Sequence, residues 1–180
     1  MRDRHKELLE LLDRSGANLY SLLFRLTLRE DAAQELMQEL FLKLSKSRGF
    51  EKSNNRDAYT RKAAINLAFD WRRKSRRDRH AQDFAYEVIA NDGSPLNKII
   101  RTEELEEMLN AIEKLNEKGR QAIVMRYIQQ QSYDDIAEQT GKTPHQARAL
   151  CSKAMSRLRQ IMGTNNEKPK TNSRKEKRNV

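Results

Sequence analysis

The sequence SYDDIAEQTGKTPHQARALCSKAMSRLR, residues 132–159, predicts two helices joined by a tight turn. Gly141 stands where the first helix would end in a residue able to take positive φ. Thr143 is a good N-cap, and Pro144 suits the first position of the second helix. The second helix has a small apolar stripe and an outer face bearing basic and amide groups, which fits the major groove of DNA. The stretch predicts a helix-turn-helix, although helix pairs with a solvated polar face also occur in many other all-α proteins.

Composition favours helices in the rest of the chain as well. Only 3 of the 180 residues are Pro and 6 are Gly, while good helix formers are plentiful. We predict an all-α fold of two small helical domains joined by a flexible linker, the C-terminal one a four-helix domain containing the helix-turn-helix. The expected boundaries are residues 1–78 for the first domain, 79–100 for the linker, 101–162 for the second domain and 163–180 for a disordered basic tail.

Positive charge is concentrated in two segments. The formal net charge is +10. Residues 72–79, RRKSRRDR, hold six basic side chains against Asp78, and residues 163–180 hold six basic side chains against Glu167 and Glu176. The rest of the chain is therefore nearly neutral, and the two basic segments suit a polyanionic partner.

The sequence offers no sign of catalysis. Cys151 is the single cysteine, and no spacing of His and Cys residues suggests a metal site. No Gly-rich phosphate loop or nucleophile–base motif is present. We therefore expect no enzyme, cofactor or metal. With neither a signal peptide nor a membrane-length apolar run, we expect a cytoplasmic protein.

Two further helices are predicted in the N-terminal half. Residues 30–47 form the clearest amphipathic pattern, with polar side chains beside a continuous apolar stripe. A second helix begins near Arg56 and runs into the basic segment of residues 72–79. The leucine-rich segment before them, residues 6–27, is also helical in spacing, with a possible break or bend near Ser15-Gly16.

Taken together, the two halves resemble a bacterial RNA polymerase sigma factor of the small, two-domain extracytoplasmic-function type. The resemblance covers roughly residues 5–162 outside the linker. It is carried by REDAAQELMQELFLKL (residues 29–44), RKAAINLAFDWRRKSRR (residues 61–77) and the stretch from Leu109 through the helix-turn-helix. These segments are similar to the family's polymerase-docking helix, promoter-melting helix and promoter-reading domain.

The resemblance implies core RNA polymerase and promoter DNA as partners, and an anti-sigma factor as a further candidate. It implies three functional sites. The polymerase-binding candidates are Asp31, Gln34, Glu35, Gln38 and Glu39. The candidates for the melted proximal element are Phe50, Asn66, Arg72, Arg73, Lys74, Arg76 and Arg77. The candidates for the distal promoter element are Thr143, His145, Gln146, Arg148, Ala149, Ser152, Lys153 and Arg157.

One alternative function stays open on the sequence. A free-standing transcriptional regulator would combine the same helix-turn-helix with an N-terminal domain used for dimerisation or sensing. Dependence on a partner separates the two hypotheses, because a sigma factor binds core polymerase whereas a repressor binds duplex operator alone.

Overall fold

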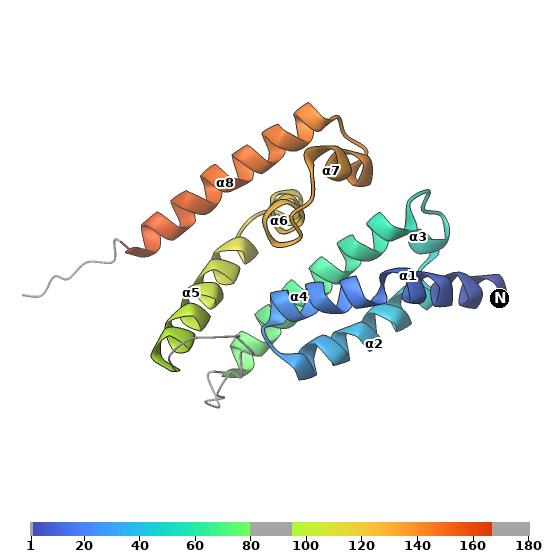
Figure 1. Cartoon of the computed structure of the whole chain (residues 1–180), viewed down its shortest axis with the longest axis horizontal. Coiled ribbons are helices and arrows are strands. Elements are labelled where there is room, and N and C mark those ends of the chain that lie inside the picture. Colours follow the sequence, from blue (N-terminus) through green and yellow to red (C-terminus); the bar gives the residue numbers. More distant parts are fainter. Residues whose placement is uncertain (1, 80–94, 167–180) are drawn as a thin grey trace, which may run out of the picture.

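The computed structural model describes residues 2–79 and 95–166, and these residues form helices and short connections without a strand (Figure 1). The elements in order are α1 (Arg2–Thr27), α2 (Glu30–Lys46), α3 (Arg48–Glu51), α4 (Arg56–Arg79), α5 (Pro95–Glu113), α6 (Glu117–Ile123), the π-helix η1 (Val124–Ile128), α7 (Tyr133–Thr140) and α8 (Pro144–Asn166). None of the described helices is long and apolar enough to cross a membrane. The all-α fold with two helical domains is confirmed.

Helices α1, α2 and α4 pack together as the N-terminal domain. Leu23 and Leu26 of α1, Leu36 and Leu40 of α2, and Phe69 of α4 are almost fully buried in its core. The leucines of α2 follow the helical stripe read from the sequence. Burial of that stripe leaves the opposite face of α2 on the surface.

The first helix has no break near Ser15-Gly16. Helix α1 runs without interruption from Arg2 to Thr27, and it passes through Gly16. Near this point Arg14 and Ser15 both donate hydrogen bonds to the Asp57 carboxylate of α4, at 2.7 and 3.1 Å. Contacts with α4 therefore support the segment in which a glycine weakens the helix.

The C-terminal domain is built on α8, which packs against α6 and α7 and also contacts α5. Ala147, Cys151 and Leu158 line the buried stripe of α8. The thiol of Cys151 lies 3.7 Å from the carbonyl oxygen of Ala122 in α6. These residues belong to the core, as their spacing in the sequence indicates.

Some element boundaries differ from those expected. Helix α5 begins at Pro95, so residues 95–100 are helical rather than linker. Helix α8 continues to Asn166, four residues past the expected end. The remaining linker, residues 80–94, and the tail beyond Asn166 lie outside the described residues.

A short helix followed by a π-helix precedes the helix-turn-helix. Helix α6 ends at Ile123, and the wider turn η1 covers Val124–Ile128. Such single π-helical turns leave one residue out of the α-helical register. The turn leaves Tyr127 50% exposed although it lies in a hydrophobic run.

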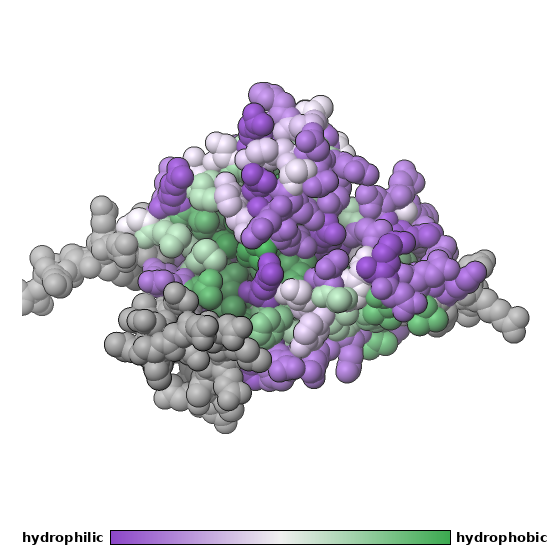
Figure 2. All heavy atoms as spheres, in the orientation of Figure 1, coloured by the Kyte–Doolittle hydropathy of each residue, from purple (hydrophilic) through white to green (hydrophobic). Residues whose placement is uncertain are grey.

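The two domains are in contact. Side chains of α4 reach α5 and the start of α6, and Arg61 of α4 reaches Gln139 of α7. Figure 1 shows α4 and α5 on facing sides of the two domains. The space-filling view of the same face is mostly hydrophilic around α7 and the start of α8, whereas hydrophobic surface shows between α5 and α8 (Figure 2).

Candidate DNA and polymerase interfaces

Helix α7 has well-defined ends. The Ser132 hydroxyl accepts a hydrogen bond from the Asp135 amide at 3.0 Å, and the Asp135 carboxylate accepts one from the Ser132 amide at 3.1 Å. This reciprocal pair is a capping box. At the other end Gly141 takes φ 64°, a left-handed conformation that reverses the chain toward α8.

A second reciprocal cap opens α8. The backbone amide of Gln146 donates a hydrogen bond to the Thr143 hydroxyl at 3.2 Å, and the Gln146 side-chain oxygen accepts one from the backbone amide of Thr143 at 3.1 Å. Gln146 is a candidate for the distal promoter element, and in the structure its side-chain oxygen caps the start of α8. The pattern T-x-x-Q that signals this cap is present in the sequence.

All the candidates for the distal promoter element are exposed, and they lie on helix α8 and at its N-cap. Thr143 lies at the cap, and the others lie along α8: His145, Gln146, Arg148, Ala149, Ser152, Lys153 and Arg157. Ala147, Cys151 and Ala154 between them are buried. The helix therefore presents a continuous polar and basic face beyond the turn, which is the geometry of a recognition helix.

Tyr133 holds two arginines on its ring. The guanidinium carbon of Arg126 lies 4.6 Å from the ring centroid and that of Arg148 lies 5.1 Å from it. Arg126 also donates to the carbonyl oxygen of Gln131 at 2.6 Å. The ring thus links η1 to the exposed face of α8 through cation–π contacts.

The polymerase-binding candidates form an exposed face of α2. Asp31, Gln34, Glu35, Gln38 and Glu39 are all exposed, while Leu36 and Leu40 between them are buried. Asp31 at the start of this face is paired with Arg29, and the hydrogen bond from Arg29 lowers the pKa of the Asp31 carboxyl. The guanidinium of Arg29 also lies 6.0 Å from the ring centroid of Trp71, which joins this end of α2 to α4.

The basic residues of α4 lie in different environments. Lys74, Arg76 and Arg77 are exposed, and Arg73 is partly exposed and paired with Asp70. Arg72 is only 2% exposed. Its guanidinium donates to the carbonyl oxygen of Leu26, near the end of α1, at 3.2 Å.

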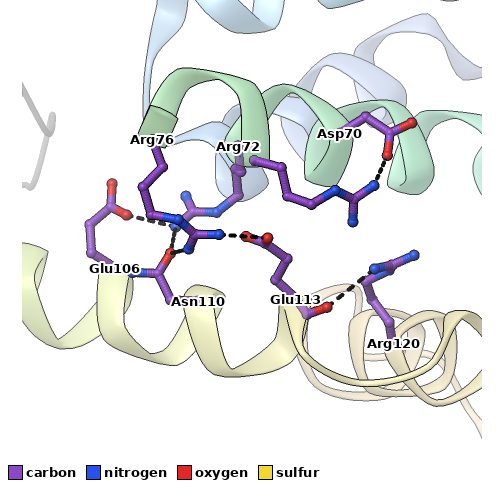
Figure 3. A network of polar contacts seen from close by, with 8 residues as sticks. Asp70, Arg72, Arg76, Glu106, Asn110, Glu113 and Arg120 are labelled. Carbon is purple, nitrogen blue, oxygen red and sulfur yellow. Dashed lines mark hydrogen bonds and ion pairs between the residues drawn. The ribbon is translucent and has the colours of Figure 1, made fainter. Parts of the chain in front are cut away.

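Arg72 and Arg76 also bind the C-terminal domain (Figure 3). Arg72 Nη2 lies 2.6 Å from Glu106 Oε2, and Arg76 Nη2 lies 2.7 Å from Glu113 Oε1. Both guanidinium groups donate to the side-chain oxygen of Asn110, at 3.0 and 3.1 Å. Acidic and amide side chains of α5 therefore bind two of the arginines that are expected to contact melted DNA.

Asn66 is engaged in a similar way. Its amide nitrogen donates to Glu117 Oε1 at 3.0 Å, and Lys62 lies 3.2 Å from the same oxygen. These hydrogen bonds, led by that from Asn66, lower the pKa of the Glu117 carboxyl. Asn66, a candidate for the melted proximal element, is thus held by a carboxylate of α6.

Phe50 is fully buried, with its ring edge-on to Tyr59 at 6.2 Å between centroids. It is therefore not on the accessible surface in this conformation. The loop beside it does border a cleft of about 600 Å³, together with cations from both domains. Its lining includes Ser53, Asn54, Asn55, Arg61, Lys62, Lys118 and Lys142.

Two family models match the chain, one in each domain. The model described as Sigma-70 region 2 matches residues 11–78, and that described as Sigma-70, region 4 matches residues 105–158. Together they cover more than half of the chain, in the expected order. The chain belongs to the sigma-70 family. It is a sigma factor that directs transcription initiation.

A solved structure also resembles this sigma factor. A chain in the co-crystal structure of the sigma factor RpoE in complex with the anti-sigma factor NepR from Bartonella quintana is 24% identical. The match covers 92% of this chain and 99% of that chain, with a TM-score of 0.49. No curated protein matches this sigma factor in the sequence comparison. The family assignment rests on the two models, and it disfavours a free-standing regulator.

Proposed function

We propose that the sigma factor divides its work among three surfaces. The exposed face of α8 reads the distal promoter element, the exposed face of α2 docks on core RNA polymerase, and the basic residues of α4 hold melted DNA. The observation that supports this best is the capped turn before α8, which leaves the whole candidate face of that helix exposed beside a buried small-residue stripe.

On the distal element, Arg148 is the strongest candidate for base contact. An arginine can donate two hydrogen bonds to guanine in the major groove, and it lies in the N-terminal turns of α8, which reach deepest into the groove. Thr143, Lys153 and Arg157 are better placed for phosphates, because they flank that centre.

On the melted element, phosphates need a cationic track, and an extruded base needs polar groups to read it. Lys74, Arg76 and Arg77 supply exposed cations on one stretch of α4, and Asn66 supplies an amide two turns earlier. Arg72 has a structural role as well, because it bonds a carbonyl oxygen at the end of α1. We therefore expect its substitution to disturb the fold together with any DNA contact.

Reconstitution tests the proposed function. Purified protein mixed with core polymerase should form a stable complex and yield promoter-directed transcripts that core polymerase alone does not produce. Tight binding to duplex operator without association with core polymerase would contradict it. We also propose that the protein works in the cytoplasm and catalyses no reaction by itself, and that an anti-sigma factor is a candidate partner to seek by pull-down from cell extract.

The docking surface can be tested separately. We expect Glu35→Ala combined with Gln38→Ala to weaken association with core polymerase, because both side chains lie exposed on the candidate face of α2. Promoter preference should not change, because α8 is untouched. Lys43→Ala, also exposed on α2, serves as the control. An equal loss in that control would argue against a specific docking face.

A further inference from the structure

We propose that Tyr133 is a positioning residue for promoter reading: its ring holds the guanidinium of Arg148 in place on the exposed face of α8, ready to donate to a base. This inference rests on the proposed role of α8 in reading the distal promoter element, and it deepens that role. It makes a residue of α7, the first helix of the helix-turn-helix, a determinant of base specificity that acts through another side chain.

The ring of Tyr133 has a fixed place in the C-terminal domain. Tyr133 is the first residue of α7 and follows Ser132, whose capping box fixes the backbone of that turn. The residue is half-buried, and it packs against the hydrophobic core. Arg126 of η1 lies over the same ring and is itself tied to the carbonyl oxygen of Gln131 at 2.6 Å. The ring is therefore in position before DNA arrives.

Arg148 contacts this ring and keeps its hydrogen-bond donors free. Its guanidinium carbon lies 5.1 Å from the ring centroid. The residue is exposed, and its side chain has no hydrogen bond or ion pair with another described residue. A guanidinium carries its N–H donors in its own plane, so an aromatic face can attract it without taking a donor. Arg148 can therefore stay on the ring while it donates to a guanine edge.

Such positioning affects the choice between bases more than the general attraction to DNA. A paired hydrogen bond to guanine requires one side-chain geometry, and an unrestrained arginine loses rotamer freedom to reach it. Contacts with phosphates carry no sequence information, so they do not depend on this geometry. Loss of the ring should therefore lower the preference for the correct base about two- to fivefold, the value of an exposed cation–π contact.

The test is in vitro transcription with core polymerase from promoters that vary in the distal element. Tyr133→Leu removes the ring and Tyr133→Phe keeps it. The control Tyr127→Leu makes the same change at a tyrosine that is 50% exposed and has no described contact with an arginine. The readout is the ratio of transcripts from the preferred promoter to those from promoters changed at the position that Arg148→Ala makes indifferent. This ratio does not depend on how much of a variant is folded.

We expect Tyr133→Leu to lower the ratio about two- to fivefold. Tyr133→Phe and Tyr127→Leu should leave it at the wild-type level. In an Arg148→Ala background, Tyr133→Leu should have no further effect on the ratio, because the ring acts through that arginine. An unchanged or increased ratio in Tyr133→Leu would overturn the proposal, as would a further loss in the Arg148→Ala background.

Wild-type protein gives a second test that needs no variant to fold. NMR relaxation of the arginine Nε–H groups, measured without DNA, should show Arg148 to be more ordered than Arg159. Arg159 is an exposed arginine of α8 with no described ring or hydrogen-bond partner. Equal order in the two side chains would overturn the proposal.

The two levels of inference fail in different ways. Unchanged promoter preference in Arg148→Ala would refute the proposed reading role of α8, and the role of Tyr133 with it. A change in Arg148→Ala without any change in Tyr133→Leu would refute the role of Tyr133 alone.

Discussion

Arg148 is held by a neighbouring aromatic ring and is still exposed for contact with DNA. Its guanidinium rests over Tyr133, while the residue remains exposed on α8. The ring restricts the arginine without taking its hydrogen-bond donors, so less conformational entropy is lost when it meets a base. The nearby Arg126 lies over the same ring and is tied to the backbone at Gln131.

We expect Arg148→Ala to lower use of the preferred promoter, at a cost of roughly 1–3 kcal/mol in discrimination against the wrong base. Core-polymerase binding should stay at the wild-type level, because α2 is unchanged. In vitro transcription from a promoter library, paired with a core-binding assay, measures both. A variant that lost core binding and kept its promoter preference would refute the division of labour.

Gln146 allows capping and base reading to be separated. We expect Gln146→Glu to preserve thermal stability, because a carboxylate also accepts the Thr143 amide in a capping box. It should change promoter preference if the side-chain amide nitrogen donates to a base, since glutamate lacks that donor. Thermal unfolding and the same promoter library measure the two effects. Unchanged preference would remove Gln146 from the reading set.

At the residue scale, the sequence predicts exposure well and long-range partners poorly. Every candidate on α8 is exposed because helical periodicity separates it from the stripe containing Ala147 and Cys151. Arg72 is different, because burial of an arginine depends on acceptors that α1 and α5 supply from distant parts of the chain. No local pattern around residue 72 carries that information.

Among the elements, the turn between α7 and α8 follows from local chemistry. The caps at Ser132 and Thr143 and the left-handed Gly141 each require a particular residue type at a particular place. The π-helix η1 could not be predicted, since hydrophobic periodicity over residues 119–128 fits a regular helix as well. Continuity of α1 through Gly16 depends on packing, which overrides propensity.

We expect Ser132→Ala to lower the free energy of unfolding by about 1 kcal/mol, because it removes the N-cap of α7. Urea unfolding followed by circular dichroism measures the change. Ser156→Ala, at an exposed mid-helix position of α8, is the control and should alter stability by less than about 0.5 kcal/mol. Equal effects of the two substitutions would show that the cap contributes nothing.

The same cap has a predictable pH dependence. Hydrogen bonds from Ser132 lower the pKa of the Asp135 carboxyl below its usual value. The contribution of this pair is therefore present at neutral pH, above the unfolded pKa of about 3.9, and is lost as pH falls through the lower folded pKa. The effect of Ser132→Ala on stability should shrink over that acidic range, and a constant effect would contradict the assignment.

For the whole molecule, the basic tail offers a test of non-specific attraction. Truncation after Asn166 removes six basic and two acidic residues while leaving α8 complete. We expect weaker binding to random duplex DNA at low salt and a shallower dependence of affinity on salt, because fewer counterions are released. Promoter preference should stay the same. An unchanged salt slope would show that the tail does not contact DNA.

The two helical domains could be predicted from periodicity and composition, but their contact could not. The pairs joining them, such as Arg72 with Glu106 and Arg76 with Glu113, lie more than thirty positions apart. Charge in the basic block indicated a polyanionic partner. The structure shows that the chain itself supplies carboxylates to that block.

Because residues 80–94 connect α4 to α5 in one chain, Glu106 and Glu113 of α5 are held near Arg72 and Arg76 of α4 at a fixed effective concentration. Diluting the protein does not weaken this contact, whereas it does weaken encounters with polymerase and DNA. A partner that uses Arg72 and Arg76 therefore competes with carboxylates whose local concentration does not change when the protein is diluted.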